Sequence, residues 1–114
     1  MKLTFLGTRG YIDAASRRHR RHASLLVSYY GRKVMIDCGE DWLGNIDSVN
    51  PDAIVITHSH PDHARGLKQG APCPVFATSD SWGKLGQFPI RDRQTVLPGT
   101  PLDIAGIRFE AFPV

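Results

Sequence analysis

The sequence predicts an α/β domain in which strands and helices alternate along the chain and pack in layers. Short apolar runs rich in β-branched residues recur over the 114 residues, and they predict strands. Segments with helical spacing lie between several of these runs, and a strand-rich tail follows. No repeat, low-complexity tract or linker interrupts residues 1–114, so we expect a single domain.

The first elements are a strand, a long loop and a hairpin. Residues 2–6 form the predicted strand, and residues 8–22 show no apolar period and form the loop. Loops longer than about 12 residues are uncommon in compact domains and are often functional. Residues 23–30 and 33–36 flank a Gly-Arg pair that includes Gly31, which favours a β-hairpin.

A helix over 41–49 and a buried strand over 53–57 come next. The helix prediction rests on apolar residues at helical spacing, namely Trp42, Leu43, Ile46 and Val49. Gly44 weakens the predicted helix by about 1 kcal/mol relative to alanine, and Asn50-Pro51 ends it. Residues 53–57 are apolar without alternation, as expected of a strand that is buried on both faces.

The remaining elements begin at Pro61, which suits the first turn of a helix. That helix is predicted to reach Gln69, with Gly70 beyond its end. A strand over 74–77 and a helix over 79–85 follow. The last strand candidates are residues 94–97, 102–105 and 107–112.

Composition places the chain among ordinary soluble proteins. The hydrophobic fraction is 41% and the charged fraction 22%, and no apolar run approaches the ~20 residues of a membrane span. The first residues do not resemble a secretory signal. Cys38 and Cys73 lack metal-type spacing, so we expect reduced thiols and a cytoplasmic protein without a membrane partner.

The positive charge is concentrated in one segment, Arg17-Arg18-His19-Arg20-Arg21-His22. The net charge is +3, yet outside this segment ten basic residues stand against eleven acidic ones. Any affinity for anions therefore depends on Arg17, Arg18, Arg20 and Arg21. The alternative is a solvated loop whose charge serves solubility.

Four metal-capable side chains fall within six residues directly after the 53–57 strand: His58, His60, Asp62 and His63. Imidazole and carboxylate groups are ligands of hydrolytic zinc, manganese and iron sites. On an extended segment His58 and His60 point to the same side. Adjacent residues on a helix diverge by about 100°, so Asp62 and His63 need not bind one ion.

The simplest arrangement has two divalent ions, zinc first and manganese or iron as alternatives. His58 and His60 would hold one ion, and Asp62 and His63 the other. Such a pair can share a hydroxide and stabilise both the attacking and the leaving oxygen. Asp62 then has two candidate tasks, as a metal ligand and as a catalytic acceptor of the hydroxide's hydrogen bond.

The run from His58 to Leu67 resembles the H-x-H-x-D-H signature of the metallo-β-lactamase superfamily, and the order of elements around it agrees. The resemblance implies an αββα sandwich with a dinuclear metal site on its rim. It assigns His58 and His60 to the first metal, and Asp62 and His63 to the second. Asp37 matches the family's acidic residue that supports the ligands; the alternative is an aspartate that only ends a strand.

The family pattern requires further ligands, two histidines and a bridging aspartate, after His63. No histidine follows His63, and residues 109–114 resemble the strand that leads into the next ligand. We therefore expect an incomplete domain, the N-terminal half of the sandwich, with weak metal binding and little activity. An exposed apolar sheet face would then favour association, so a homo-oligomer is expected as an alternative to a monomer.

The basic segment and the run from Ile36 to Trp42 are similar to the branch with cyclic-phosphate phosphodiesterases and transfer-RNA 3′-processing enzymes. This resemblance implies phosphodiester hydrolysis by a metal-bridging hydroxide. Arginine binds phosphate through two parallel hydrogen bonds, and the loop lacks interleaved aromatics. A small anionic phosphodiester is thus favoured over a long nucleic acid. The alternatives are an anion- or nucleic-acid-binding module, or hydrolysis of a thioester, lactone or β-lactam.

Overall fold

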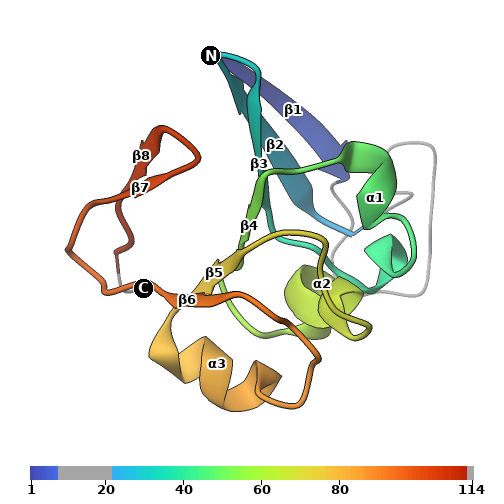
Figure 1. The fold of residues 1–114 in the computed structure, drawn as a ribbon. Helices are drawn as coiled ribbons and strands as arrows, with labels where there is room; N and C mark the ends of the chain where they lie inside the picture. The colour runs from blue at the N-terminus through green and yellow to red at the C-terminus, as the bar shows by residue number, and fades with distance from the viewer. Residues whose placement is uncertain (8–21, 113–114) are drawn as a thin grey trace.

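The computed structural model describes residues 1–7 and 22–112. Six strands form one mixed sheet in the order β1-β2-β3-β4-β5-β6 (Figure 1). The first three are antiparallel neighbours, and β3 to β6 are parallel. Their bounds are β1 Lys2–Gly7, β2 Ser24–Tyr29, β3 Arg32–Ile36, β4 Ala53–Val55, β5 Val75–Ala77 and β6 Arg93–Thr95.

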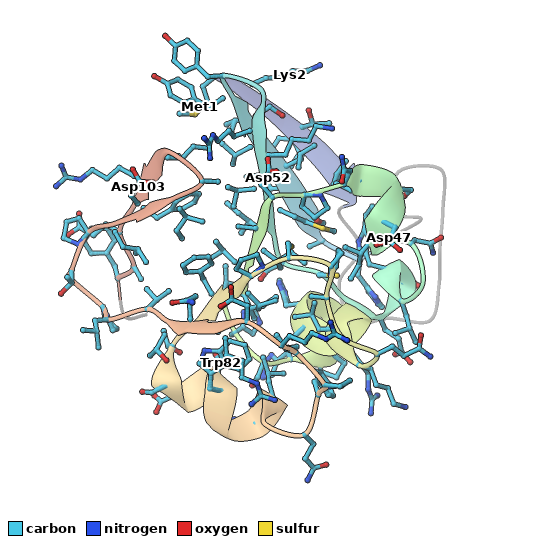
Figure 2. All side chains as sticks on the ribbon, viewed as in Figure 1. Met1, Lys2, Asp47, Asp52, Trp82 and Asp103 are labelled. Atoms are coloured by element: carbon cyan, nitrogen blue, oxygen red, sulfur yellow. The ribbon has the colours of Figure 1, made fainter. Side chains whose placement is uncertain are left out.

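The helices cover one face of this sheet. They are η1 Glu40–Trp42, α1 Ile46–Val49, α2 Pro61–Ala64, η2 Arg65–Leu67 and α3 Ser79–Leu85. Their apolar side chains pack with Met35 of β3 and Ile54 of β4 in the larger core cluster. The Trp82 indole of α3 donates a hydrogen bond of 2.9 Å to the Gln94 carbonyl of β6. Trp82 and Lys2 mark opposite ends of the molecule (Figure 2).

A hairpin of β7, Leu102–Ile104, and β8, Ile107–Phe109, lies on the other face (Figure 1). It forms a smaller cluster with Val27, Val34 and Ala53. Alternation along each strand separates the two clusters, because neighbouring side chains point to opposite faces. The layered α/β class is therefore confirmed. Among the described residues, no helix is long and apolar enough to cross a bilayer.

The predicted helix over 41–49 is wrong in its middle. Its two ends form η1 and α1, and a turn separates them. Gly44 lies in that turn with φ +80°, a left-handed conformation that a continuous helix does not contain. The apolar spacing that predicted the helix still brings Trp42 and Ile46 into the core.

The predicted helix over 61–69 is also shorter than expected. It divides at Arg65 into α2 and η2, and the tighter η2 ends at Leu67. The Gly66 N–H donates to the Cys38 carbonyl at 2.9 Å, so it does not continue the i→i−4 ladder of a helix. Contact with the end of β3 therefore determines where α2 stops.

The predicted strands are confirmed in place, and several are shorter. The strand expected over 53–57 ends at Val55. Although the Ile56 N–H still donates to Phe76 of β5, the Thr57 N–H donates to the Asp37 carboxylate. The chain thus leaves the sheet where the metal-capable residues begin. The last strand likewise ends at Phe109 instead of 112.

Candidate metal centre

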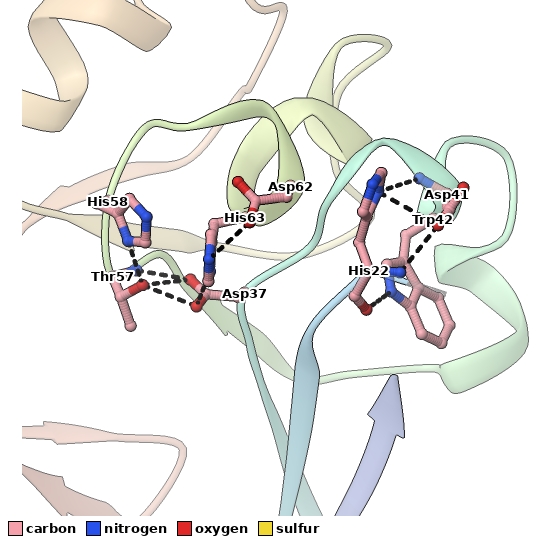
Figure 3. Close-up of polar contacts among 8 residues, drawn as sticks. All are labelled: His22, Asp37, Asp41, Trp42, Thr57, His58, Asp62 and His63. Carbon is pink, nitrogen blue, oxygen red and sulfur yellow. Dashed lines mark hydrogen bonds and ion pairs between the residues drawn. The ribbon is translucent and has the colours of Figure 1, made fainter. Parts of the chain in front are cut away.

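The metal-capable residues lie at the carboxyl ends of two adjacent parallel strands, β3 and β4 (Figure 3). Asp37 follows β3 directly, and the segment from Thr57 to His63 follows β4. Parallel strands end at one edge of a sheet, where open α/β sheets bind ligands. Two segments about 20 residues apart in sequence are thereby brought together.

His58, Asp62 and His63 form a group of ligand atoms suited to one metal ion. One donor atom from each lies within 4.8 Å of the other two. The rings of His58 and His63 have centroids 4.0 Å apart, and Asp62 is buried. Two imidazoles and a carboxylate match the donors of hydrolytic metal sites. The residues present therefore fit a divalent ion.

The His63 ring lies between two carboxylates. Its Nδ1 is 2.7 Å from Asp37 Oδ2, and its Nε2 is 3.1 Å from Asp62 Oδ2. When Nδ1 carries the proton and donates to Asp37, the lone pair of Nε2 faces a lone pair of Asp62 Oδ2, and the two repel each other. A proton or a metal cation between Nε2 and Asp62 relieves that repulsion. Asp37 thus orients His63 for metal binding.

Asp37 also acts on His58 through Thr57. The Asp37 carboxylate accepts from the Thr57 N–H at 2.8 Å and from the Thr57 hydroxyl at 2.7 Å. Thr57 Oγ1 is in turn 3.0 Å from His58 Nδ1. Because the hydroxyl has a single proton and gives it to Asp37, its oxygen accepts from His58 Nδ1–H. His58 Nε2 is then left with a lone pair for a metal.

The backbone of Asp37 explains how one carboxylate reaches both partners. Its φ is +65°, a left-handed conformation that aspartate tolerates better than most residues. The Asp37 N–H still donates to the Val55 carbonyl at 2.8 Å. The chain therefore turns out of the sheet at Asp37 while it stays anchored to β4.

The local environment favours the neutral form of His58. Burial, followed by the neighbouring His63, lowers the pKa of His58 below its ordinary value of 6.5. Asp37 opposes this shift. Metals bind the neutral imidazole, so less competition from protons is expected at His58 than at an isolated histidine.

His60 lies beside this group. Its ring packs edge-on against the His58 ring with centroids 4.8 Å apart, which agrees with the expectation that both point to one side. Among the described residues, the group whose donor atoms lie within 4.8 Å of one another consists of His58, Asp62 and His63, and it does not include His60. The assignment of His58 and His60 to one ion, and of Asp62 and His63 to another, stays a prediction.

The other predicted site residues lie outside the described residues. They are Arg17, Arg18, Arg20 and Arg21, which precede His22 in the sequence. His22 is described and buried. Its N–H donates to Asp41 Oδ2 at 2.9 Å, and its Nδ1 accepts from the Asp41 N–H at 3.1 Å (Figure 3). The chain that follows the arginines is therefore fixed to η1.

Sequence reasoning did not assign roles to Thr57 or to the His22–Asp41 pair. Thr57 carries a recognisable signal, since it is a hydroxyl residue placed between a buried strand and the first histidine. His22 and Asp41 are 19 residues apart in sequence. No local pattern indicates their reciprocal hydrogen bonds, which depend on how η1 packs.

Comparison with known proteins agrees with this geometry. The sequence model of the family described as "Anti-Pycsar protein Apyc1" matches residues 1–85. Ribonuclease Z of Bradyrhizobium diazoefficiens is 37% identical over 98% of the chain, which covers 45% of that enzyme. Ribonuclease Z of Methanopyrus kandleri is 30% identical over 93% of the chain and 43% of the enzyme. The chain thus spans about half the length of these relatives.

Solved structures show the same fold. A diphosphatase from the PhnP family superposes with a TM-score of 0.72 and 26% identity, over 94% of the chain and 54% of the diphosphatase. Zn²⁺-bound PqqB from Methylobacterium extorquens superposes with a TM-score of 0.77 and 17% identity, over 98% of the chain and 55% of PqqB. Because PqqB is only 17% identical to the chain, its similarity supports the fold alone.

Proposed function

Because the chain belongs to the family described as anti-Pycsar protein Apyc1 and has the metallo-β-lactamase fold, we propose that it is a metal-dependent hydrolase of phosphodiesters. The observation that carries this proposal is the convergence of His58, Asp62 and His63 within 4.8 Å. The names of the relatives support the bond type, since ribonuclease Z and a PhnP-family diphosphatase both act on phosphate esters or anhydrides.

The described residues have distinct tasks in this proposal. His58 and His60 would hold one ion, and Asp62 and His63 would hold a second ion beside it. A bound divalent ion, zinc first and manganese or iron as alternatives, supplies Lewis-acid stabilisation of negative charge and makes water nucleophilic near neutral pH. Asp62 is both a ligand and the acceptor that orients the attacking water. Asp37 and Thr57 keep the two imidazoles in the metal-binding tautomer.

The arginine segment would hold the anionic substrate. Arg17, Arg18, Arg20 and Arg21 provide planar donors that bind phosphate oxygens in pairs. His22 supports this role, because its hydrogen bonds to Asp41 hold the end of the segment at η1. We propose a small phosphodiester as the substrate and the cytoplasm as the location.

A binding module is the second candidate function. The observation in its favour is the concentration of positive charge between Arg17 and His22, which attracts anions whether or not a metal is bound. Such a module would bind phosphate groups without turnover. Hydrolysis of a thioester, lactone or β-lactam is a third candidate that keeps the metal site and changes the bond.

Turnover of bis(p-nitrophenyl) phosphate with added Zn²⁺ or Mn²⁺ tests the proposal. We expect weak turnover that requires the metal and falls at least about tenfold in His58→Ala, since a ligand is lost. Tyr30→Phe, at an exposed position of the β2–β3 turn, is the control and should retain the rate. If the metal gives no turnover while His58→Ala still binds polyanions, the binding module replaces the enzyme. Parallel assays with thioester, lactone and β-lactam substrates test the third candidate.

A further inference from the structure

A pocket adjoins the turn that carries the candidate metal ligands, on the side of α3. It has a volume of about 350 Å³. Its walls come from the turn before α2, from η2, and from the end of α3 with the residues that follow. Its lining includes Ser59, Pro61, Arg65, Lys68, Lys84, Leu85 and Phe88.

The charged side chains that line this pocket are all positive. Arg65, Lys68 and Lys84 line it, and no carboxylate is among the lining residues. All three cations are exposed. Among the described residues, none of them has an acidic partner within ion-pair distance. Three unpaired cations around one concavity attract an anion more strongly than the same charges dispersed over a surface.

The pocket shares its wall with the metal ligands. Ser59 stands between His58 and His60, and Pro61 stands between His60 and Asp62. Consecutive Cα atoms are about 3.8 Å apart, so the metal-capable residues and the residues of the pocket wall alternate along a single turn. The pocket and the candidate metal centre are therefore neighbours on this turn.

Two apolar residues also line the pocket. Leu85 is buried and Phe88 is half-buried, and both are among the lining residues. A lining that combines apolar and cationic residues suits a group that combines a ring and a phosphate, because aromatic side chains stack on bases and cations bind the phosphate oxygens. A nucleotide unit has this chemistry, whereas an isolated inorganic anion would leave the apolar lining unused.

We propose that the Arg65–Lys68–Lys84 pocket is a subsite for a nucleotide phosphate that the substrate carries beyond the scissile phosphodiester. This inference rests on the proposed function, since it assigns the substrate a second phosphate. It favours a dinucleotide or a short oligonucleotide with a terminal phosphate over a substrate that has one phosphodiester only.

Binding of two dinucleotides to the metal-free chain tests the subsite. The probes are the thymidine dinucleotide TpT and its 5′-phosphorylated form pTpT, titrated in EDTA so that hydrolysis does not occur. We expect pTpT to bind at least about tenfold more tightly, because one charge-assisted hydrogen bond to phosphate is worth about that factor. Backbone amides of Ser59, Arg65 and Lys84 should shift in NMR spectra on addition of pTpT.

A triple variant locates the binding. Arg65→Gln/Lys68→Gln/Lys84→Gln should bring the affinity for pTpT down to that for TpT and reduce the salt dependence of binding. The matched control Lys2→Gln/Arg32→Gln/Arg108→Gln removes the same charge from exposed positions of β1, β3 and β8. Lys2 lies at the end of the molecule opposite α3 (Figure 2). This control should bind pTpT as the unmodified chain does.

Three results would overturn the subsite. They are equal affinities for the two dinucleotides, an unchanged affinity in the triple variant, and inorganic phosphate that competes as well as pTpT. The last result would make the pocket a site for free phosphate. The proposed hydrolase is tested separately by metal-dependent turnover, so either proposal can fail while the other stands. A thermal melt of the triple variant confirms that it is folded.

Discussion

Asp37 is the residue on which the geometry of the candidate centre depends most. Its carboxylate accepts from His63 Nδ1 at 2.7 Å and from the Thr57 hydroxyl at 2.7 Å, and Thr57 extends the network to His58. One buried carboxylate therefore fixes two imidazoles whose own positions in the sequence are five residues apart. A ligand set arranged in this way loses little conformational freedom when a metal binds.

Thr57→Val tests the hydrogen bond between Thr57 and His58 in this network. Valine keeps the shape of threonine and removes the hydroxyl, so His58 Nδ1 loses its acceptor and the tautomer is no longer fixed. We expect the affinity for Zn²⁺ to fall about tenfold, the lower end of the range for residues that support ligands. The ¹⁵N chemical shifts of the His58 ring in the metal-free protein should show a mixture of tautomers.

Thr57→Ser restores the hydroxyl and should restore both the affinity and the single tautomer. Thr95→Val, at an exposed position of β6, is the matched control and should change neither. A Thr57→Val protein with normal ring shifts and normal affinity would show that Asp37 acts on His63 alone.

The Cys38 thiol makes the free energy of unfolding depend on pH. Burial, followed by the charge of Asp37, raises the pKa of this thiol from 9.0 to about 12. The unfolded chain releases the proton near pH 9, and the folded chain retains it. The free energy of unfolding should therefore be unaffected by Cys38 below pH 9 and fall by roughly 1 kcal/mol per pH unit between 9.5 and 11. Urea unfolding from pH 8 to 11 measures this slope.

Cys38→Ala separates this contribution from that of Cys73, whose pKa burial raises to about 11. The variant lowers stability at every pH by removing core volume, but its slope above pH 9 should be shallower. Equal slopes in the two proteins would contradict a buried, protonated Cys38.

At the scale of elements, α2 is positioned by close backbone contact with the end of β3. The Cys38 N–H donates to the His63 carbonyl at 2.6 Å, and the Gly66 N–H donates to the Cys38 carbonyl. A Cβ on Gly39 would meet the Asp62 carbonyl and His22 Cβ. The absence of a side chain at Gly39 thus lets η1, His22 and the metal-ligand helix approach one another.

Gly39→Ala should separate these elements. The added methyl group would clash with backbone atoms that cannot rotate away, so we expect a loss of about 2 kcal/mol or more in the free energy of unfolding together with weaker Zn²⁺ binding. Gly83→Ala is the control, because a Cβ at this helical position meets nothing within 4 Å. It should raise stability by up to about 1 kcal/mol. Chemical unfolding and metal titration of both variants check the prediction, and normal metal binding by Gly39→Ala would contradict it.

The order and type of the elements could be predicted from the sequence, whereas their ends could not. Apolar periodicity located the strands, and Pro61 located the start of α2. The end of α2 depends on the contact of Gly66 with Cys38, and the end of β4 depends on the contact of Thr57 with Asp37. The metal-capable residues were evident from their spacing, and their role as ligands stays a prediction. The hydrogen-bond network behind them joins residues about 20 positions apart, so it could not be predicted without the fold.

At the scale of the whole molecule, one sheet face is only partly covered. The β7–β8 hairpin packs on Val27, Val34 and Ala53, while on the same face Leu3 is 55% exposed and Phe5 is 73% exposed. Leu3 pairs with Val27 and Phe5 with Leu25, so the exposed residues continue the apolar surface beyond the hairpin. Contiguous apolar surface of this kind favours association.

Sedimentation velocity measures the consequence. We expect the 114-residue chain to self-associate as its concentration rises, and Leu3→Lys/Phe5→Lys to shift the population to monomer by placing two charges on the face. Lys2→Glu/Thr4→Glu places charges on the same strand at other positions and serves as the control. A monomer at every concentration, or identical behaviour of the two double variants, would contradict association through this face.

Equilibrium titration of the chain with Zn²⁺ against a chromophoric chelator tests whether His58, Asp62 and His63 form a metal site. We expect saturable binding that His58→Ala, Asp62→Ala and His63→Ala each weaken at least about tenfold, while Asp92→Ala, at an exposed site near β6, leaves it unchanged. Binding that survives all three substitutions, or no saturable binding by the unmodified chain, would show that these residues do not form a metal site.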